Sequence, residues 1–154
     1  MTTPAQPNQL ARFVEAQDRG NTYDRAVAEL RAGQKSSHWM WFVFPQIAGL
    51  GRSPTAQLYA VRSLGEARDY LEHPILGPRL LECTRIVVEL DPSPRSAEDI
   101  FGATDALKLR SSMTLFARAA PNEPIFMQAL NRYFGGEADA ETDRLLRAGW
   151  TLST

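Results

Sequence analysis

Histidine is the side chain best suited to proton transfer near neutral pH, and this chain has two, His38 and His73. His38 lies between a polar segment and a block of aromatic residues, which together have the composition of the rim of an apolar pocket. We therefore take His38 as a candidate general acid or base, with a purely structural role as the alternative. His73 precedes Pro74 in a predicted turn between two helices, where a capping or solvated role is sufficient.

The aromatic block covers residues 39–44 and is followed by Pro45, which prevents a regular helix from continuing. A short helix with large apolar groups on every side must be buried nearly all round, so one interpretation is a plug at the centre of the core. In the second interpretation the block also lines a ligand site whose rim is formed by the flanking polar residues. The candidate ligand-binding residues in this segment are Lys35, Ser37, His38, Trp39, Trp41 and Gln46.

A glycine-rich turn at residues 49–53 precedes a predicted helix whose first turn holds Pro54. Free amides at such a helix start can bind phosphate or carboxylate, and Arg52 could add a bidentate contact. Arg52 and Ser53 therefore join the candidate ligand-binding residues, while a plain turn capped by Ser53 is the alternative. The turn matches neither a nucleoside-triphosphate loop nor a dinucleotide fingerprint, because the required lysine or third glycine is absent.

Three polar residues share one edge of the helix predicted to follow residue 104: Asp105, Lys108 and Ser112. A lysine and a serine one turn apart can act as base and nucleophile, and Asp105 could orient either of them. The weak catalytic candidates are therefore His38, Asp105, Lys108 and Ser112. The structural alternative is that Thr104 or Asp105 caps the helix, that Lys108 pairs with Asp105, and that Ser112 fills a tight contact.

No metal site or cofactor is assigned from this sequence. Two histidines and one cysteine, Cys83, lack the number and spacing of zinc ligands. A single cysteine also excludes a disulfide scaffold and fits a reduced, cytoplasmic setting.

The charge balance of the chain excludes a general attraction to polyanions. Lysine and arginine number 17 against 18 aspartate and glutamate residues, a formal net charge of -1, so nucleic acid is not an expected partner. The longest apolar run covers residues 39–44, whereas a membrane-spanning helix needs about 20 residues. We therefore expect a soluble protein. The candidate residues described above indicate a small anionic ligand as its partner.

The elements that must position these residues are predicted to be helices. The 154 residues, 44% of them hydrophobic, contain no visible linker, which predicts a single domain over residues 10–154 after a flexible tail at residues 1–9. Start and stop signals delimit helices at residues 10–17, 22–33, 64–72, 78–91, 96–102 and 122–134, and a last helix begins near Thr142. Strand and hairpin signals are poor. We predict an all-α fold of about seven or eight helices, allowing one or two short strands.

Four strings carry a family resemblance: residues 35–46, 73–80, 100–102 and 108–116. With these strings the chain resembles, from about Leu10 to Leu146, the bacterial family catalogued as domain of unknown function 1810. Members are sometimes labelled calpastatin, but an inhibitor of that type would be a disordered repeat chain, and this sequence is compact and apolar. The resemblance implies a compact multihelical fold and supplies no activity.

Two functions from different classes follow. The first is a binding domain for a small anion, such as a nucleotide or phosphorylated metabolite, with or without catalysis; the second is a protein interaction module that performs no reaction. The first requires the segments 35–46 and 105–112 to line one cleft. We predict such a cleft with six polar residues, namely Lys35, His38, Arg52, Asp105, Lys108 and Ser112.

Overall fold

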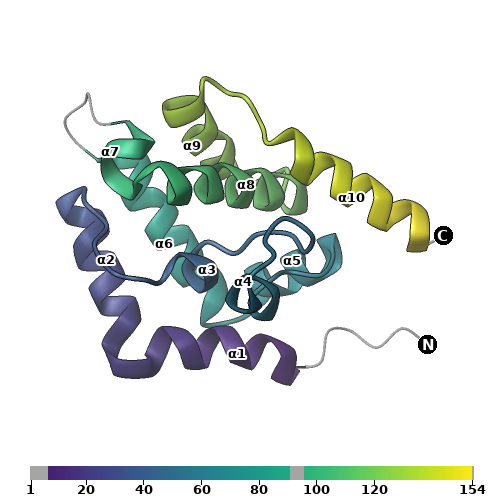
Figure 1. The fold of residues 1–154 in the computed structure, drawn as a ribbon, viewed down its shortest axis with the longest axis horizontal. Helices are drawn as coiled ribbons and strands as arrows, with labels where there is room; N and C mark the ends of the chain where they lie inside the picture. Colours follow the sequence, from purple (N-terminus) through teal and green to yellow (C-terminus); the bar gives the residue numbers. More distant parts are fainter. Residues whose placement is uncertain (1–6, 91–95, 154) are drawn as a thin grey trace.

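Helices α1 to α10 make up most of the described chain, which comprises residues 7–90 and 96–153 of a computed structural model (Figure 1). They are α1 Pro7–Asp18, α2 Thr22–Ala32, α3 Met40–Val43, α4 Pro54–Leu58, α5 Leu64–Glu72, α6 Leu76–Glu89, α7 Ala97–Phe101, α8 Ala103–Ala119, α9 Ile125–Phe134 and α10 Ala140–Ser153. A 3-10 turn, Arg19–Asn21, joins α1 to α2. Within these residues the extended pairing is limited to one parallel bridge between Ile47 and Val61.

The all-α class predicted from the sequence is confirmed. The helices of the described residues exceed the seven or eight expected, and the three shortest, α3, α4 and α7, have only four or five residues each. Local signals in the sequence indicate these short helices at residues 39–44, at Pro54 and at residues 96–102. Helix α1 begins at Pro7, so residues 7–9 of the predicted tail are helical, as suits a proline in a first helical turn. The rest of that predicted tail lies outside the described residues.

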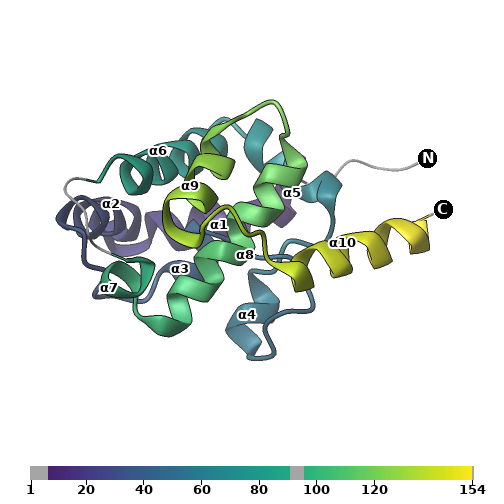
Figure 2. The same ribbon diagram turned by 90° about the horizontal axis from the view of Figure 1, so that it is seen from above.

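Helix α8 packs extensively against four other helices. It contacts α5, α7, α9 and α10, while α6 contacts α2, α5 and α9 behind it. Helix α1 contacts α2 and α3 and runs along the lower edge of the molecule in Figure 1. Seen from above, α3 lies beside the first half of α8 (Figure 2), as it does in Figure 1. None of the helices in the described residues is long and apolar enough to span a membrane.

Several helix ends follow the predicted local signals. Gly33 ends α2 in the left-handed region, at φ 73°, and Ser96 with Asp99 forms a reciprocal capping box at the start of α7. Ser63 stands three residues before Glu66, the spacing of a capping box, but only half of that box forms. The Ser63 hydroxyl accepts the Glu66 amide, but the Glu66 carboxylate accepts the Arg62 amide at 3.0 Å instead of the Ser63 amide.

The aromatic block forms the centre of the core, as the first interpretation predicts. Trp39 and Phe44 are fully buried, with ring centroids 6.3 Å apart. The Phe44 ring meets Phe101 edge to face at 6.2 Å, and the Phe42 ring lies 5.2 Å from Tyr59. Such pairs add to the free energy that burial of the rings already supplies.

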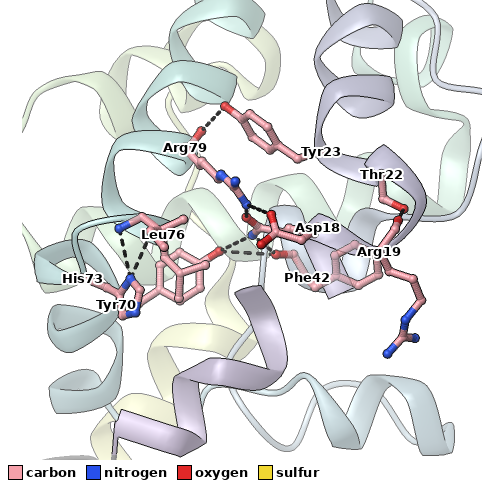
Figure 3. A network of polar contacts seen from close by, with 11 residues as sticks. Asp18, Arg19, Thr22, Tyr23, Phe42, Tyr70, His73, Leu76 and Arg79 are labelled. Carbon is pink, nitrogen blue, oxygen red and sulfur yellow. Dashed lines mark hydrogen bonds and ion pairs between the residues drawn. The ribbon is translucent and has the colours of Figure 1, made fainter. Parts of the chain in front are cut away.

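A buried polar network holds α3 in place (Figure 3). The Phe42 carbonyl, which has no partner within its own short helix, accepts hydrogen bonds from Gln17 Nε2 at 2.8 Å and from the Tyr70 hydroxyl at 3.3 Å. Arg79 donates to Gln17 Oε1 at 3.1 Å and pairs with Asp18 at 2.9 Å. Burial raises the pKa of Tyr70, so its hydroxyl stays protonated and can donate. The network thus fixes α3 against α1, α5 and α6.

Candidate functional site

Lys35 is positioned by the end of α2 and by α7. After Gly33 reverses the chain, the Gln34 amide donates to the Glu29 carbonyl at 3.0 Å. The Lys35 amide then donates to the Ile100 carbonyl at 2.7 Å. These two hydrogen bonds fix the backbone at Lys35 between α2 and α7, which are distant in sequence. The Cα atom of Lys35 is therefore held in one place.

Glu29 organises the loop that follows Lys35. Its carboxylate accepts hydrogen bonds from the amides of Ser36 and Ser37, at 2.8 and 3.0 Å, from Trp39 Nε1 at 2.8 Å and from the Ser37 hydroxyl. Burial acts to raise the pKa of Glu29, but the hydrogen bonds from Ser37, Ser36 and Trp39 outweigh it and lower the pKa to about 2. The carboxylate is therefore ionised, and it occupies the polar atoms of Ser37 that the sequence assigned to a ligand.

No motif in the sequence marks Glu29 as the residue that organises this loop. One signal was present, because an acidic residue in the second half of a helix is disfavoured by the helix dipole and so implies a partner beyond the helix end. That signal does not say which groups the carboxylate meets.

We expect Glu29→Gln to lower the free energy of unfolding at pH 7 by roughly 2 kcal/mol, because an amide accepts these hydrogen bonds less strongly than a carboxylate. The pKa of Glu29 is about 2 in the folded chain against an ordinary value of 4.5. Its contribution is therefore complete above pH 4.5 and is lost as the pH falls toward 2. Urea unfolding of both proteins across that range should show the difference shrinking.

The control for this comparison is Glu15→Gln, which removes an exposed carboxylate from α1 and should change stability by less than about 0.5 kcal/mol. A difference between parent and Glu29→Gln that stays constant with pH would show that the loop does not depend on the charge of Glu29.

Lys35 is almost completely enclosed. Its ammonium group donates to the Ser37 carbonyl at 2.6 Å and pairs with Asp105 Oδ2 at 2.7 Å, and it lies 5.0 Å from the centroid of the Trp39 ring. Its side chain is 7% exposed. With a carbonyl, a carboxylate and an aromatic face around it, Lys35 is held in one position.

Lys108 approaches the same carboxylate from α8. Its ammonium group lies 3.4 Å from Asp105 Oδ1 and 4.6 Å from the centroid of the Trp41 ring. Asp105 stands in the first turn of α8, where the helix dipole favours a negative charge. Two ammonium groups thus share one carboxylate beside two indole rings. We call these five residues, Lys35, Trp39, Trp41, Asp105 and Lys108, the lysine-pair site.

The structure therefore brings the two predicted segments together through Lys35, Asp105 and Lys108. Lys108 also pairs with Asp105, as the structural alternative expected. The N-cap of α8 is Gly102, with no side-chain hydrogen bond, so neither Thr104 nor Asp105 caps this helix. Ser112 lies one turn beyond Lys108 on the same face of α8 and is fully buried. Within the described residues its hydroxyl has no hydrogen-bond partner.

The glycine-rich turn behaves as a plain turn. Ser53 caps α4 by accepting the Ala56 amide at 3.1 Å, and the Arg52 carbonyl accepts the side chain of Gln57 at 3.0 Å. The side chain of Arg52 is exposed, and within the described residues it makes no hydrogen bond, ion pair or cation–π contact with the lysine-pair site. Free amides at the start of so short a helix do not by themselves make an anion site.

The remaining predicted residues make no hydrogen bond or ion pair with the two ammonium groups in the described part of the chain. His38 is exposed in the loop after Lys35, next to Ser37, whose carbonyl accepts the Lys35 ammonium group. Gln46 is half-buried, and its carbonyl accepts the Val61 amide at 2.8 Å. His73 has the capping role expected for it, because its Nδ1 accepts the amides of Ile75 and Leu76 at 3.1 and 3.2 Å.

Metal-ligating side chains and the single cysteine are further groups that could carry chemistry in this chain. No group of three or more histidine, cysteine, aspartate or glutamate side chains in the described part of the chain is arranged to hold a metal ion. Cys83 is buried in α6, and burial raises the pKa of its thiol to about 12, which keeps the thiol protonated and unreactive.

An open groove of about 440 Å³ lies between α2 and α6. It is lined by Arg31, Glu82, Arg85, Ile86, Glu89 and Leu90, none of which belongs to the lysine-pair site. Two arginines and two glutamates make its charges cancel, so the groove offers no preference for an anion. At the lysine-pair site, by contrast, two ammonium groups pair with a single carboxylate, Asp105.

Comparison with known proteins agrees with the fold. The chain is similar to a solved structure, the crystal structure of the conserved hypothetical protein Rv1873 from Mycobacterium tuberculosis at 1.38 Å, with 53% sequence identity and a TM-score of 0.87. The similarity covers 92% of this chain and 99% of that chain. No curated protein matches the sequence. The model of the family described as "Protein of unknown function (DUF1810)" matches residues 7–146, and the chain therefore belongs to that family.

Proposed function

We propose that this domain binds a small anionic molecule, of the class of phosphorylated metabolites and nucleotides, at the lysine-pair site. The observation that carries the proposal is the sharing of one carboxylate, Asp105, by the ammonium groups of Lys35 and Lys108. Among these three groups one positive charge is left over in a partly buried position, and the neighbouring ionised carboxylate, Glu29, already accepts hydrogen bonds from the loop amides and from Trp39. Attraction to an anion is stronger there than at an open surface, because the protein interior screens charge less than water does.

Lys108 is the group that meets the ligand in this proposal. Its side chain is 20% exposed and its separation from Asp105, 3.4 Å, exceeds the 2.7 Å of the Lys35 pair. Asp105 can therefore stay paired with Lys35 while Lys108 turns toward an anion. Trp41 is half-buried next to Lys108 and offers a flat apolar surface for the rest of the ligand.

The test is isothermal titration of inorganic phosphate, pyrophosphate and adenosine monophosphate into the parent protein and into Lys108→Ala. We expect at least one of these anions to bind the parent, and the variant to bind it roughly tenfold to a hundredfold more weakly, the range typical of one charged hydrogen bond. Thermal unfolding with and without each anion provides a second measurement, since a ligand of the folded state raises the melting temperature.

Arg19→Ala is the matched control, because it removes one positive charge from an exposed position in the turn between α1 and α2 (Figure 3). This variant should bind the anion as the parent does. Equal weakening in both variants would show a general charge effect and overturn the assignment to the lysine-pair site. Failure of every anion to bind at millimolar concentration would overturn the proposed function.

A further inference from the structure

Lys35 and Lys108 are the only lysines in the sequence, and both lie at the lysine-pair site. Every other basic residue of the 17 is arginine. Arginine supplies the ion pairs elsewhere in the described residues, for example Arg79 with Asp18 and Arg118 with Asp143. The chain thus places both of its lysines at one site and has arginine at every other basic position.

The two side chains differ in one chemical property that matters here. A guanidinium group stays protonated in proteins, whereas an amine can give up its proton and become a nucleophile, as in lysines that form imines with carbonyl compounds. Concentration of both lysines at one site therefore points to chemistry that arginine could not perform.

The geometry distinguishes the roles of the two amines. Lys35 is held by the Ser37 carbonyl, the Asp105 carboxylate and the Trp39 ring, and it is 7% exposed. Lys108 has a single, longer ion pair and greater exposure. Lys35 is thus a fixed positive charge that keeps Asp105 in place, while Lys108 is the amine that a ligand can reach.

We propose that Lys108 forms an imine with the carbonyl group of an anionic aldehyde or ketone, a step that rests on the anion binding proposed above. The Lys108 ammonium group first loses a proton to solvent water, and the neutral amine attacks the carbonyl carbon. The carbonyl electron pair moves to oxygen, which takes a proton from the nitrogen. The resulting hydroxyl then takes up a proton equivalent to the one released at the start and leaves as water, while the nitrogen lone pair forms the carbon–nitrogen double bond. The products are the protonated imine and water, and the step needs no oxidant or reductant.

Ser112 adds an independent feature on the same face of α8. The hydroxyls of Thr84, Ser111 and Thr114 are buried on helices and donate to the carbonyl four residues earlier, at 2.8, 3.1 and 2.8 Å. The Ser112 hydroxyl makes no such bond in the described residues, although it is fully buried. An unpaired buried hydroxyl costs free energy unless a partner satisfies it, and one turn beyond Lys108 that partner can be the ligand oxygen or the departing water.

Pyridoxal 5′-phosphate is the probe that tests this inference, since it joins an aldehyde to a phosphate group. Sodium borohydride reduces any imine to a stable secondary amine, and peptide mass mapping then locates it at Lys35 or Lys108 without ambiguity. We expect saturable modification of Lys108, at least about tenfold faster than that of N-acetyl-lysine amide in solution, because the site holds the aldehyde against the amine. Lys108→Arg should abolish this modification.

Pyridoxine 5′-phosphate, which has an alcohol in place of the aldehyde, separates this inference from the proposed function. Its binding is measured by calorimetry and by protection of Lys108 from the aldehyde. One outcome is that pyridoxine 5′-phosphate binds the parent and binds Lys108→Ala more weakly, while the aldehyde modifies Lys108 no faster than it modifies N-acetyl-lysine amide. Anion binding then stands and imine formation is overturned. If neither compound binds, both proposals fail. Modification of Lys35 in preference to Lys108 also overturns the assignment of the reactive amine.

Discussion

Replacing Trp39 by alanine is expected to lower the free energy of unfolding by about 3–5 kcal/mol, the range for removal of a large side chain from a core. The Trp39 ring is fully buried and lies 6.3 Å from the Phe44 ring, so its removal leaves a cavity at the centre of the molecule. The substitution also removes the donor that Trp39 Nε1 presents to Glu29 at 2.8 Å. Urea unfolding followed by circular dichroism measures the loss without relying on tryptophan fluorescence.

Two variants separate the causes of that loss. Trp39→Phe keeps most of the buried ring and removes the indole donor, so its free energy of unfolding should fall by less than that of Trp39→Ala. Trp41→Ala removes a ring that is only half-buried, so its free energy of unfolding should also fall by less than that of Trp39→Ala. A loss below about 1 kcal/mol in Trp39→Ala would contradict the central position of this ring.

Replacing Gly77 by alanine is expected to destabilise the protein by about 3 kcal/mol or more, at the upper end of the cost of overpacking. Gly77 lies in the first turn of α6, which follows α5 after a short turn. A β-carbon at this position would lie 2.0 Å from the Leu71 carbonyl oxygen and 2.9 Å from its carbonyl carbon. These are backbone atoms of α5, so the clash cannot be relieved by rotating a side chain.

Gly65→Ala is the matched control within α5. Its β-carbon would find the Ser63 hydroxyl oxygen at 3.7 Å, an ordinary contact. Alanine is the better helix former by up to about 1 kcal/mol, so this variant should be as stable as the parent or slightly more stable. Thermal and urea unfolding of the two variants measure the contrast. Parent-like stability in Gly77→Ala would show that α5 and α6 can move apart at little cost.

The helical class and many helix ends could be predicted from the sequence because they depend on neighbours within one turn. A serine that caps an amide three residues later, as Ser96 does with Asp99, is visible in the order of residues alone. So is the left-handed glycine that ends a helix, as Gly33 does. The burial of the aromatic block was predictable for a related reason, since no face of a segment so rich in large rings can remain in water.

The partners of ionised side chains were not predictable in this way. Glu66 has the sequence position of a capping residue, yet its carboxylate meets Arg12 from α1 at 3.5 Å. Glu29 has no motif at all, yet it binds the loop that follows α2. Such contacts depend on how whole helices pack, and a charged group in a partly buried place takes whichever partner that packing brings near.

The candidate site shows the same division between local and tertiary information. The order of residues alone determined that Asp105 and Lys108 lie on one face of a helix, because three residues make nearly one helical turn. Only the tertiary structure decided that Lys35 joins them while Arg52 and His38 do not. The reason is physical: the hydrogen bond from Lys35 to Ile100 fixes the loop beside α7 and α8, and no helical periodicity encodes a contact between segments so far apart in the chain.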